Sequence, residues 1–283
     1  MNDQKNLSVS SPPPKRRRRR ECLVFPVILL ALAFYYALYF LLRGPLPANP
    51  QLIAHRGGAD YNPENTMAAF RHAVEMDADW LEMDVQRTQD GVLVVIHDET
   101  VDRTTNGVGN VGDFTLEQLR ALDAGNGEQI PTFEEVIALA KDVNVGLLPE
   151  AKSPSLYPNV ETEMVNAVVE ADYLSQTVFQ SFEMEAVENL HRANAAVVAC
   201  PLYRLWWEVD ASAPPGDAPV LCPMAEMLLV NPWLVREAHR AGREVYVWFG
   251  VLENPMMMRT MLAFGVDGLM TNDPLMLGDV LNR

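Results

Sequence analysis

Short apolar runs alternate with amphipathic stretches over most of the chain. Eight runs have the length and composition of buried strands, and six stretches between them show the apolar spacing of helices. The expected strands are residues 51–55, 80–85, 145–151, 177–181, 196–201, 220–223, 244–248 and 268–271, and the expected helices are residues 63–76, 132–141, 159–171, 183–193, 233–241 and 255–264. Strands that alternate with helices in this way form a parallel sheet. Residues 51–283 are therefore expected to form one α/β domain, a (β/α)8 TIM barrel, whose usual length is about 250 residues.

The first fifty residues do not follow this pattern. Residues 22–42 contain no charged side chain, and their 21 positions are close to the ~20 that a helix needs to cross a bilayer. A cleavable signal peptide has a shorter apolar core, of about 7 to 15 residues, followed by small residues at the cleavage site. We therefore interpret residues 22–42 as an uncleaved transmembrane helix and residues 43–50 as a proline-containing linker to the barrel.

Charge is distributed unevenly between the two ends of the chain. The net charge is −16, yet the first fifty residues hold eight basic and only two acidic side chains, among them five consecutive arginines at positions 16–20. Basic residues beside an apolar span stay on the cytoplasmic side of the membrane. We expect residues 1–21 to be a disordered cytoplasmic tail and the barrel to lie in the periplasm or outside the cell. An acidic barrel repels nucleic acid, so we exclude that class of partner.

Polar side chains end the first apolar runs of the expected barrel. His55 and Arg56 follow the first run, while Glu82 and Asp84 lie two positions apart in the second, so their side chains point to the same face of a strand. A glycine-containing turn then sends the chain back, and a hairpin centred on that turn places His97 beside Glu82. Two carboxylates on one face repel each other unless a cation lies between them. The sequence therefore predicts a site at the active-site mouth of the barrel.

The third expected strand of the barrel carries two further charged residues. Glu150 and Lys152 are again two positions apart and share a face. Pro149 precedes them, and a proline inside a central strand removes a ladder hydrogen bond. We expect a bulge or a strand end at this proline.

Eight short motifs occur in order between residues 51 and 275. They are HRGG at 55–58, PENT at 63–66, EMDV at 82–85, IHDETVDRTTNG at 96–107, PTFEEV at 131–136, PEAK at 149–152, QSF at 180–182 and GVDGLMTNDP at 265–274. Together they resemble the glycerophosphodiester phosphodiesterases. The resemblance implies a TIM barrel that uses a divalent metal and two histidines to cleave a phosphodiester.

The resemblance also implies a role for each polar residue of the site. The implied catalytic residues are His55 and His97, the metal ligands are Glu82, Asp84 and Glu150, and the residues that bind the phosphate and the rest of the substrate are Arg56, Lys152 and Trp248. A set of three carboxylates favours a hard cation, Mg²⁺ or Ca²⁺, over zinc.

The function that follows is hydrolysis of small-molecule glycerophosphodiesters to sn-glycerol 3-phosphate and an alcohol, by an enzyme anchored in the membrane through its N-terminal helix. A lysophospholipase D or sphingomyelinase D-like activity on the head groups of membrane lipids uses the same residues and remains an alternative. A second alternative is a catalytically inactive, membrane-tethered binding protein. That alternative requires the loss of a catalytic residue, and all seven polar residues are present.

The three cysteines do not form a disulfide framework. Cys22 lies at the cytoplasmic edge of the apolar segment, while Cys200 and Cys222 fall at the ends of neighbouring expected strands. Two buried thiols are the simpler expectation for this pair, although an oxidising compartment would allow them to form a disulfide.

Overall fold

The computed structural model describes residues 18–283, with side chains from residue 25 onward, and separates into two units. The first unit ends at Leu42 and contains helix α1 (Arg18–Leu42). Within α1, residues 25–42 are long and apolar enough to cross a membrane, and a signal sequence has the same properties. The expected disordered tail at residues 1–21 lies outside the described residues except for its last four, which are helical.

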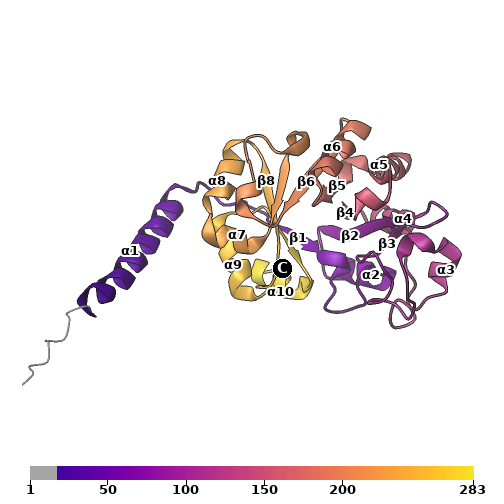
Figure 1. Cartoon of the computed structure of the whole chain (residues 1–283), viewed down its shortest axis with the longest axis horizontal. Helices are drawn as coiled ribbons and strands as arrows, with labels where there is room; N and C mark the ends of the chain where they lie inside the picture. Colours follow the sequence, from indigo (N-terminus) through magenta and orange to yellow (C-terminus); the bar gives the residue numbers. More distant parts are fainter. Residues whose placement is uncertain (1–17) are drawn as a thin grey trace, which may run out of the picture. The chain divides into compact units, whose positions relative to one another are not determined.

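The second unit, residues 43–283, is a closed barrel of eight parallel strands (Figure 1). The strands are β1 (Gln51–Ala54), β2 (Trp80–Arg87), β4 (Gly146–Ala151), β5 (Val178–Ser181), β6 (Val198–Tyr203), β7 (Val220–Pro223), β8 (Glu244–Trp248) and β9 (Gly268–Thr271). The barrel closes because β1 pairs with both β2 and β9. The predicted (β/α)8 fold is confirmed.

The hairpin expected after β2 is also present. Strand β3 (Leu93–Val95) pairs antiparallel with the end of β2, and Val85 lies opposite Val95. The register is one residue away from the one that would place His97 directly opposite Glu82. The backbone N–H of Ile96 still donates to the carbonyl of Asp84, so the returning arm brings His97 back to the carboxylates.

Helices follow most of the strands and cover the barrel. They are α2 (Met67–Glu75), α3 (Leu116–Arg120), α4 (Phe133–Val143), α5 (Val160–Glu170), α6 (Met184–Ala193), α7 (Ala225–Val230), α8 (Trp233–Arg240), α9 (Pro255–Phe264) and α10 (Pro274–Leu281). Short 3-10 turns are η1 (His55–Gly57), η2 (Val111–Asp113), η3 (Pro154–Leu156), η4 (Leu174–Gln176), η5 (Trp206–Glu208) and η6 (Pro215–Asp217). Only the last two of these turns connect β6 to β7, where the sequence gives no helical pattern.

Helix α2 begins four residues later than its apolar pattern predicts. Asn65 adopts a left-handed conformation with φ of 57°, which breaks any helix that starts at residue 63. Thr66 is the actual N-cap, and its hydroxyl accepts a hydrogen bond from the backbone N–H of Ala69.

Strand β4 continues through Pro149 in regular register. Pro149 lies opposite Met83 of β2, and the parallel pairing runs unbroken from Gly146 to Ala151 on that side, so the expected bulge or strand end is wrong. On the other side, Glu150 pairs with Gln180 of β5 after the proline, and Leu147 forms an isolated bridge with Thr177, just before β5. The ladder hydrogen bond that proline cannot donate is therefore lost without displacement of the strand.

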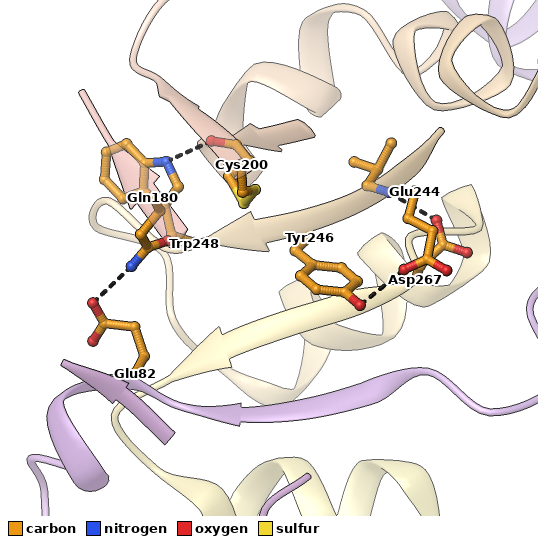
Figure 2. The surroundings of a disulfide bond; sticks show 9 residues. Glu82, Gln180, Cys200, Glu244, Tyr246, Trp248 and Asp267 are labelled. Carbon is orange, nitrogen blue, oxygen red and sulfur yellow. Dashed lines mark hydrogen bonds between the residues drawn. A yellow bond between two sulfur atoms is a disulfide. The ribbon is translucent and has the colours of Figure 1, made fainter. Parts of the chain in front are cut away.

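A disulfide joins Cys200 of β6 to Cys222 of the adjacent strand β7 inside the barrel, which corrects the expectation of two buried thiols (Figure 2). Leu202 of β6 pairs with Cys222 of β7, so Cys200, two residues earlier on the same face, is a diagonal neighbour of Cys222. Their Cα atoms are 5.7 Å apart, within the range that a disulfide spans. The cystine packs in the apolar core with Ile53, Leu148, Val178, Leu202, Val220, Tyr246 and Met270.

Candidate active site

Three buried carboxylates form the centre of the site. Glu82 and Asp84 lie on β2 and Glu150 lies on β4, where it pairs directly with Asp84. One oxygen from each carboxylate lies within 4.8 Å of the others. Burial and the charges of its two neighbours hold the pKa of Glu82 well above its usual value, and burial raises the pKa of Glu150 to about 7. Three buried carboxylates this close together can all be ionised only if positive charge lies beside them.

Lys152 and Arg56 supply part of that charge. Lys152 Nζ lies 2.8 Å from Glu150 Oε1 and 3.3 Å from Asp84 Oδ1, and Arg56 Nε lies 3.4 Å from Asp84 Oδ2. Burial opposes ionisation of Asp84, but Lys152 and Arg56 outweigh it and lower the pKa of that carboxyl. Arg56 also pairs with Glu64 at 2.9 Å.

The backbone after β1 bends sharply to place Arg56. Arg56 has a φ of 52°, and Gly57 and Gly58 also have positive φ. A Cβ atom on Gly57 would lie 2.8 Å from the Cβ of Ala69 on α2, so only glycine fits against this helix. The bend lets the backbone N–H of Arg56 donate to Glu82 Oε2 at 2.8 Å.

Two histidines lie beside the carboxylates, each held through Nδ1. His55 Nδ1 is 2.7 Å from Asn272 Oδ1, and this oxygen accepts a hydrogen bond from Nδ1–H, which leaves Nε2 as the basic atom. Nε2 of His55 is 3.9 Å from Glu82 Oε2. His97 Nδ1 hydrogen-bonds to Asp98 in the same way.

Burial keeps both imidazoles uncharged. It lowers the pKa of His55 to about 4, with a further contribution from the charge of Arg56. Burial is also the main reason that the pKa of His97 is lowered. Both rings are therefore neutral near pH 7, which suits a group that must accept a proton.

A cavity of about 540 Å³ opens over these groups. Seven of the eight residues predicted from the sequence line it, namely His55, Arg56, Glu82, His97, Glu150, Lys152 and Trp248, and the eighth, Asp84, is buried among them. Trp248, the last residue of β8, packs edge to face on Phe182 with ring centroids 5.4 Å apart. Its indole N–H donates to the carbonyl of Cys222 at 3.2 Å.

Comparison with known proteins agrees with this arrangement. The sequence model of the glycerophosphoryl diester phosphodiesterase family matches residues 55–276. The chain belongs to the glycerophosphoryl diester phosphodiesterase family.

Several bacterial relatives in this family match the barrel over most of their own length. A glycerophosphodiester phosphodiesterase of Caldanaerobacter subterraneus is 38% identical over 245 residues, which cover 82% of this chain and 98% of the relative. One from Bacillus subtilis is 31% identical over 247 residues, covering 78% and 83%. The structure of an Oleispira antarctica phosphodiesterase in complex with the product sn-glycerol-3-phosphate has a TM-score of 0.72 at 26% identity, and the match covers 83% of this chain and 98% of that one.

Several residues that orient the site of this glycerophosphoryl diester phosphodiesterase family member were missed in the sequence. Asn65 donates to Asp84 Oδ2 at 2.8 Å, and Gln180 donates to Glu82 Oε1 at 2.8 Å. Asn272 is itself held by Glu253, and Arg103 bridges Asp98 and Glu64. Most of these residues fall inside the matched motifs, but only the folded barrel shows which group each one contacts.

The residues present fit a divalent metal, on which this family depends. Glu82, Asp84 and Glu150 are buried and converge, and together they carry more negative charge than the adjacent lysine and arginine neutralise. A bound divalent cation would favour the ionised form of Glu82 and Glu150, whose pKa values are raised without it.

Proposed function

We propose that the barrel hydrolyses glycerophosphodiesters to sn-glycerol 3-phosphate and an alcohol with the help of Mg²⁺ or Ca²⁺. The observation that carries the proposal is the convergence of two neutral histidines, three carboxylates and two cationic side chains on one cavity. The named relatives are phosphodiesterases of this substrate class, and one neighbouring structure holds the product sn-glycerol-3-phosphate.

The cationic groups of the site bind the phosphate. Glu82, Asp84 and Glu150 would hold the metal, which supplies positive charge to the non-bridging oxygens when bound. Arg56 binds a phosphate oxygen through its planar guanidinium, and Lys152 adds a point charge beside it. Their ion pairs with the carboxylates keep both side chains pointed into the site.

His55 and His97 transfer the protons of the reaction. One imidazole removes the proton of the nucleophile through its free Nε2 and becomes an imidazolium. The other first takes up a proton from water on Nε2 and then, as an imidazolium, gives that proton to the alkoxide that leaves phosphorus. Asn272 and Asp98 hold the two rings through Nδ1, so that Nε2 is the reactive nitrogen of each.

We further propose that α1 anchors the protein with its N-terminus in the cytoplasm and the barrel in the periplasm or outside the cell. The basic residues before the apolar segment and the disulfide inside the barrel both support this topology. A protease added to spheroplasts or intact cells should cleave the barrel, whereas an anchor of the opposite orientation would protect it.

The activity is tested by coupled detection of glycerol 3-phosphate from several glycerophosphodiesters, with and without EDTA. We expect EDTA to abolish product formation and Mg²⁺ or Ca²⁺ to restore it. Calorimetric titration of the apoprotein with each metal should show binding that Glu150→Gln weakens. Full activity after exhaustive chelation would contradict the metal assignment, and release of head group from lysolipids alone would favour the lysophospholipase D activity.

A further inference from the structure

Arg204 is a cationic residue of the cavity wall that the proposed reaction does not use. It follows β6 and lines the same cavity as the carboxylates, but its side chain is exposed, so it lies toward solvent. Arg56 and Lys152, the other lysine and arginine of the lining, are both paired with carboxylates. Arg204 forms no ion pair within residues 25–283, so its positive charge is not neutralised by the protein.

An aromatic ring holds this charge in place. The guanidinium carbon of Arg204 lies 4.0 Å from the centroid of the Phe182 ring, a cation–π contact. Lys152 Nζ lies 5.8 Å from the same centroid, and Phe182 packs on Trp248. Stacking orients a guanidinium but leaves its N–H groups free, and a planar guanidinium pairs well with carboxylate or phosphate.

The position of Arg204 indicates which part of a substrate it meets. On the proposed function, the phosphorus lies by the buried carboxylates and histidines, and one ester arm must extend toward the open part of the cavity. The glycerol arm is the same, and uncharged, in every glycerophosphodiester. The charge of Arg204 can therefore distinguish one substrate from another only through the alcohol arm. We propose that Arg204 binds an anionic group on the alcohol part of the diester and thereby selects substrates with anionic head groups.

Two substrates that differ by a single carboxylate isolate this contact. Glycerophosphoserine is glycerophosphoethanolamine with one carboxylate added to the alcohol. We expect the ratio of their kcat/KM values to favour the serine diester in the native protein. The ratio should decline as salt is raised, because an exposed ion pair is screened.

Variants at position 204 then test the residue itself. Arg204→Gln should lower the ratio about tenfold, equivalent to about 1.4 kcal/mol, and Arg204→Glu should lower it further. Arg204→Lys should retain most of the preference because it keeps the charge. The matched control is Arg236→Gln, which removes an arginine stacked on the ring of Trp233, on α8 and outside the cavity, and should leave the ratio unchanged.

The possible outcomes separate this inference from the proposed function. Hydrolysis of both diesters with the same ratio in the native protein and in Arg204→Gln overturns the role of Arg204 and leaves the proposed function standing. Failure to hydrolyse any glycerophosphodiester or lysolipid overturns both. Lysophosphatidylserine and lysophosphatidylethanolamine form a second pair that also differs by one carboxylate. A preference seen only in this pair would mean that the anionic group belongs to a lipid head group and not to a free diester. A kcat/KM ratio that depends on Arg204 in either pair supports the inference.

Discussion

Gln180 of β5 donates a 2.8 Å hydrogen bond from its side-chain amide to Glu82 of β2, past the intervening strand β4 (Figure 2). Both side chains are buried, and the other oxygen of Glu82 accepts from the backbone of Arg56. Each oxygen of this carboxylate is thus fixed by one donor, in a place where burial opposes its ionisation. Gln180 is therefore a positioning residue for the metal site.

Replacement of this glutamine should weaken metal binding. In Gln180→Leu one oxygen of Glu82 loses its donor, so the ionised form becomes still less favourable, and we expect metal affinity to fall about 10- to 100-fold. Calorimetric titration with Mg²⁺ or Ca²⁺ measures this directly. Gln129→Leu makes the same chemical change outside the cavity and should not alter affinity. Unchanged affinity in Gln180→Leu would show that this hydrogen bond does not position Glu82.

The two histidines should be indispensable to turnover but not to folding. We expect His55→Ala and His97→Ala each to lower kcat at least ~100-fold, the lower end of what general acid–base catalysis contributes. Both rings are partly exposed to the cavity, so the melting temperature should change little. His191→Ala, on α6 and outside the cavity, is the control. A folded variant that retains native kcat would remove its histidine from the mechanism.

Stability should depend on pH through His239 on α8. Its Nε2 lies 2.8 Å from Asp267 Oδ2, and this hydrogen bond, helped by Glu244, raises its pKa above the usual 6.5. The ion pair stabilises the folded state fully below the unfolded pKa and is lost as pH rises through the folded pKa.

The change His239→Gln keeps a donor but removes the charge. The variant should therefore lose about 1 kcal/mol more of the free energy of unfolding at about pH 5.5 than at about pH 9. Urea unfolding at the two pH values measures the difference. A loss that is equal at both, or larger at high pH, would mean that the charged form of His239 does not contribute.

Thiol titration should show the disulfide. The chain has three cysteines, so unfolded, unreduced protein should present only Cys22, and reduction should expose all three. Removal of the link in the double variant Cys200→Ala, Cys222→Ala should cost about 2–4 kcal/mol of the free energy of unfolding. Three thiols in unreduced protein purified from its native compartment would contradict the disulfide.

The sequence predicted the barrel because apolar patterning is a local signal, and the family resemblance named eight candidate site residues, seven of which line one cavity. Apolar runs mark buried strands, and i, i+2 spacing sets the shared face of Glu82 and Asp84 whatever the rest of the chain does. The resemblance placed Glu150 at the same site, and in the structure Glu150 pairs with Asp84 on the neighbouring strand.

Contacts between distant residues could not be predicted in this way. Asn272 holds His55 from 217 positions away, and which amide reaches which ring depends on closure of the barrel. The start of α2 was missed because the apolar pattern does not register a left-handed residue such as Asn65. The Cys200–Cys222 bond depends on the stagger between β6 and β7, which follows from the pairing of Leu202 with Cys222.

The redox state of the buried Cys200–Cys222 pair depends on the compartment in which the chain folded. Neither Cys200 nor Cys222 is accessible to solvent in the folded barrel. An oxidant can therefore reach the two thiols only before β6 and β7 have packed into the barrel. A batch synthesised in a reducing cytosol would keep its dithiol after transfer to an aerated buffer, whereas a batch exported before folding would carry the bond. Two preparations of identical sequence would then differ by two hydrogen atoms and in heat resistance, so the production host becomes a variable in every measurement on this barrel.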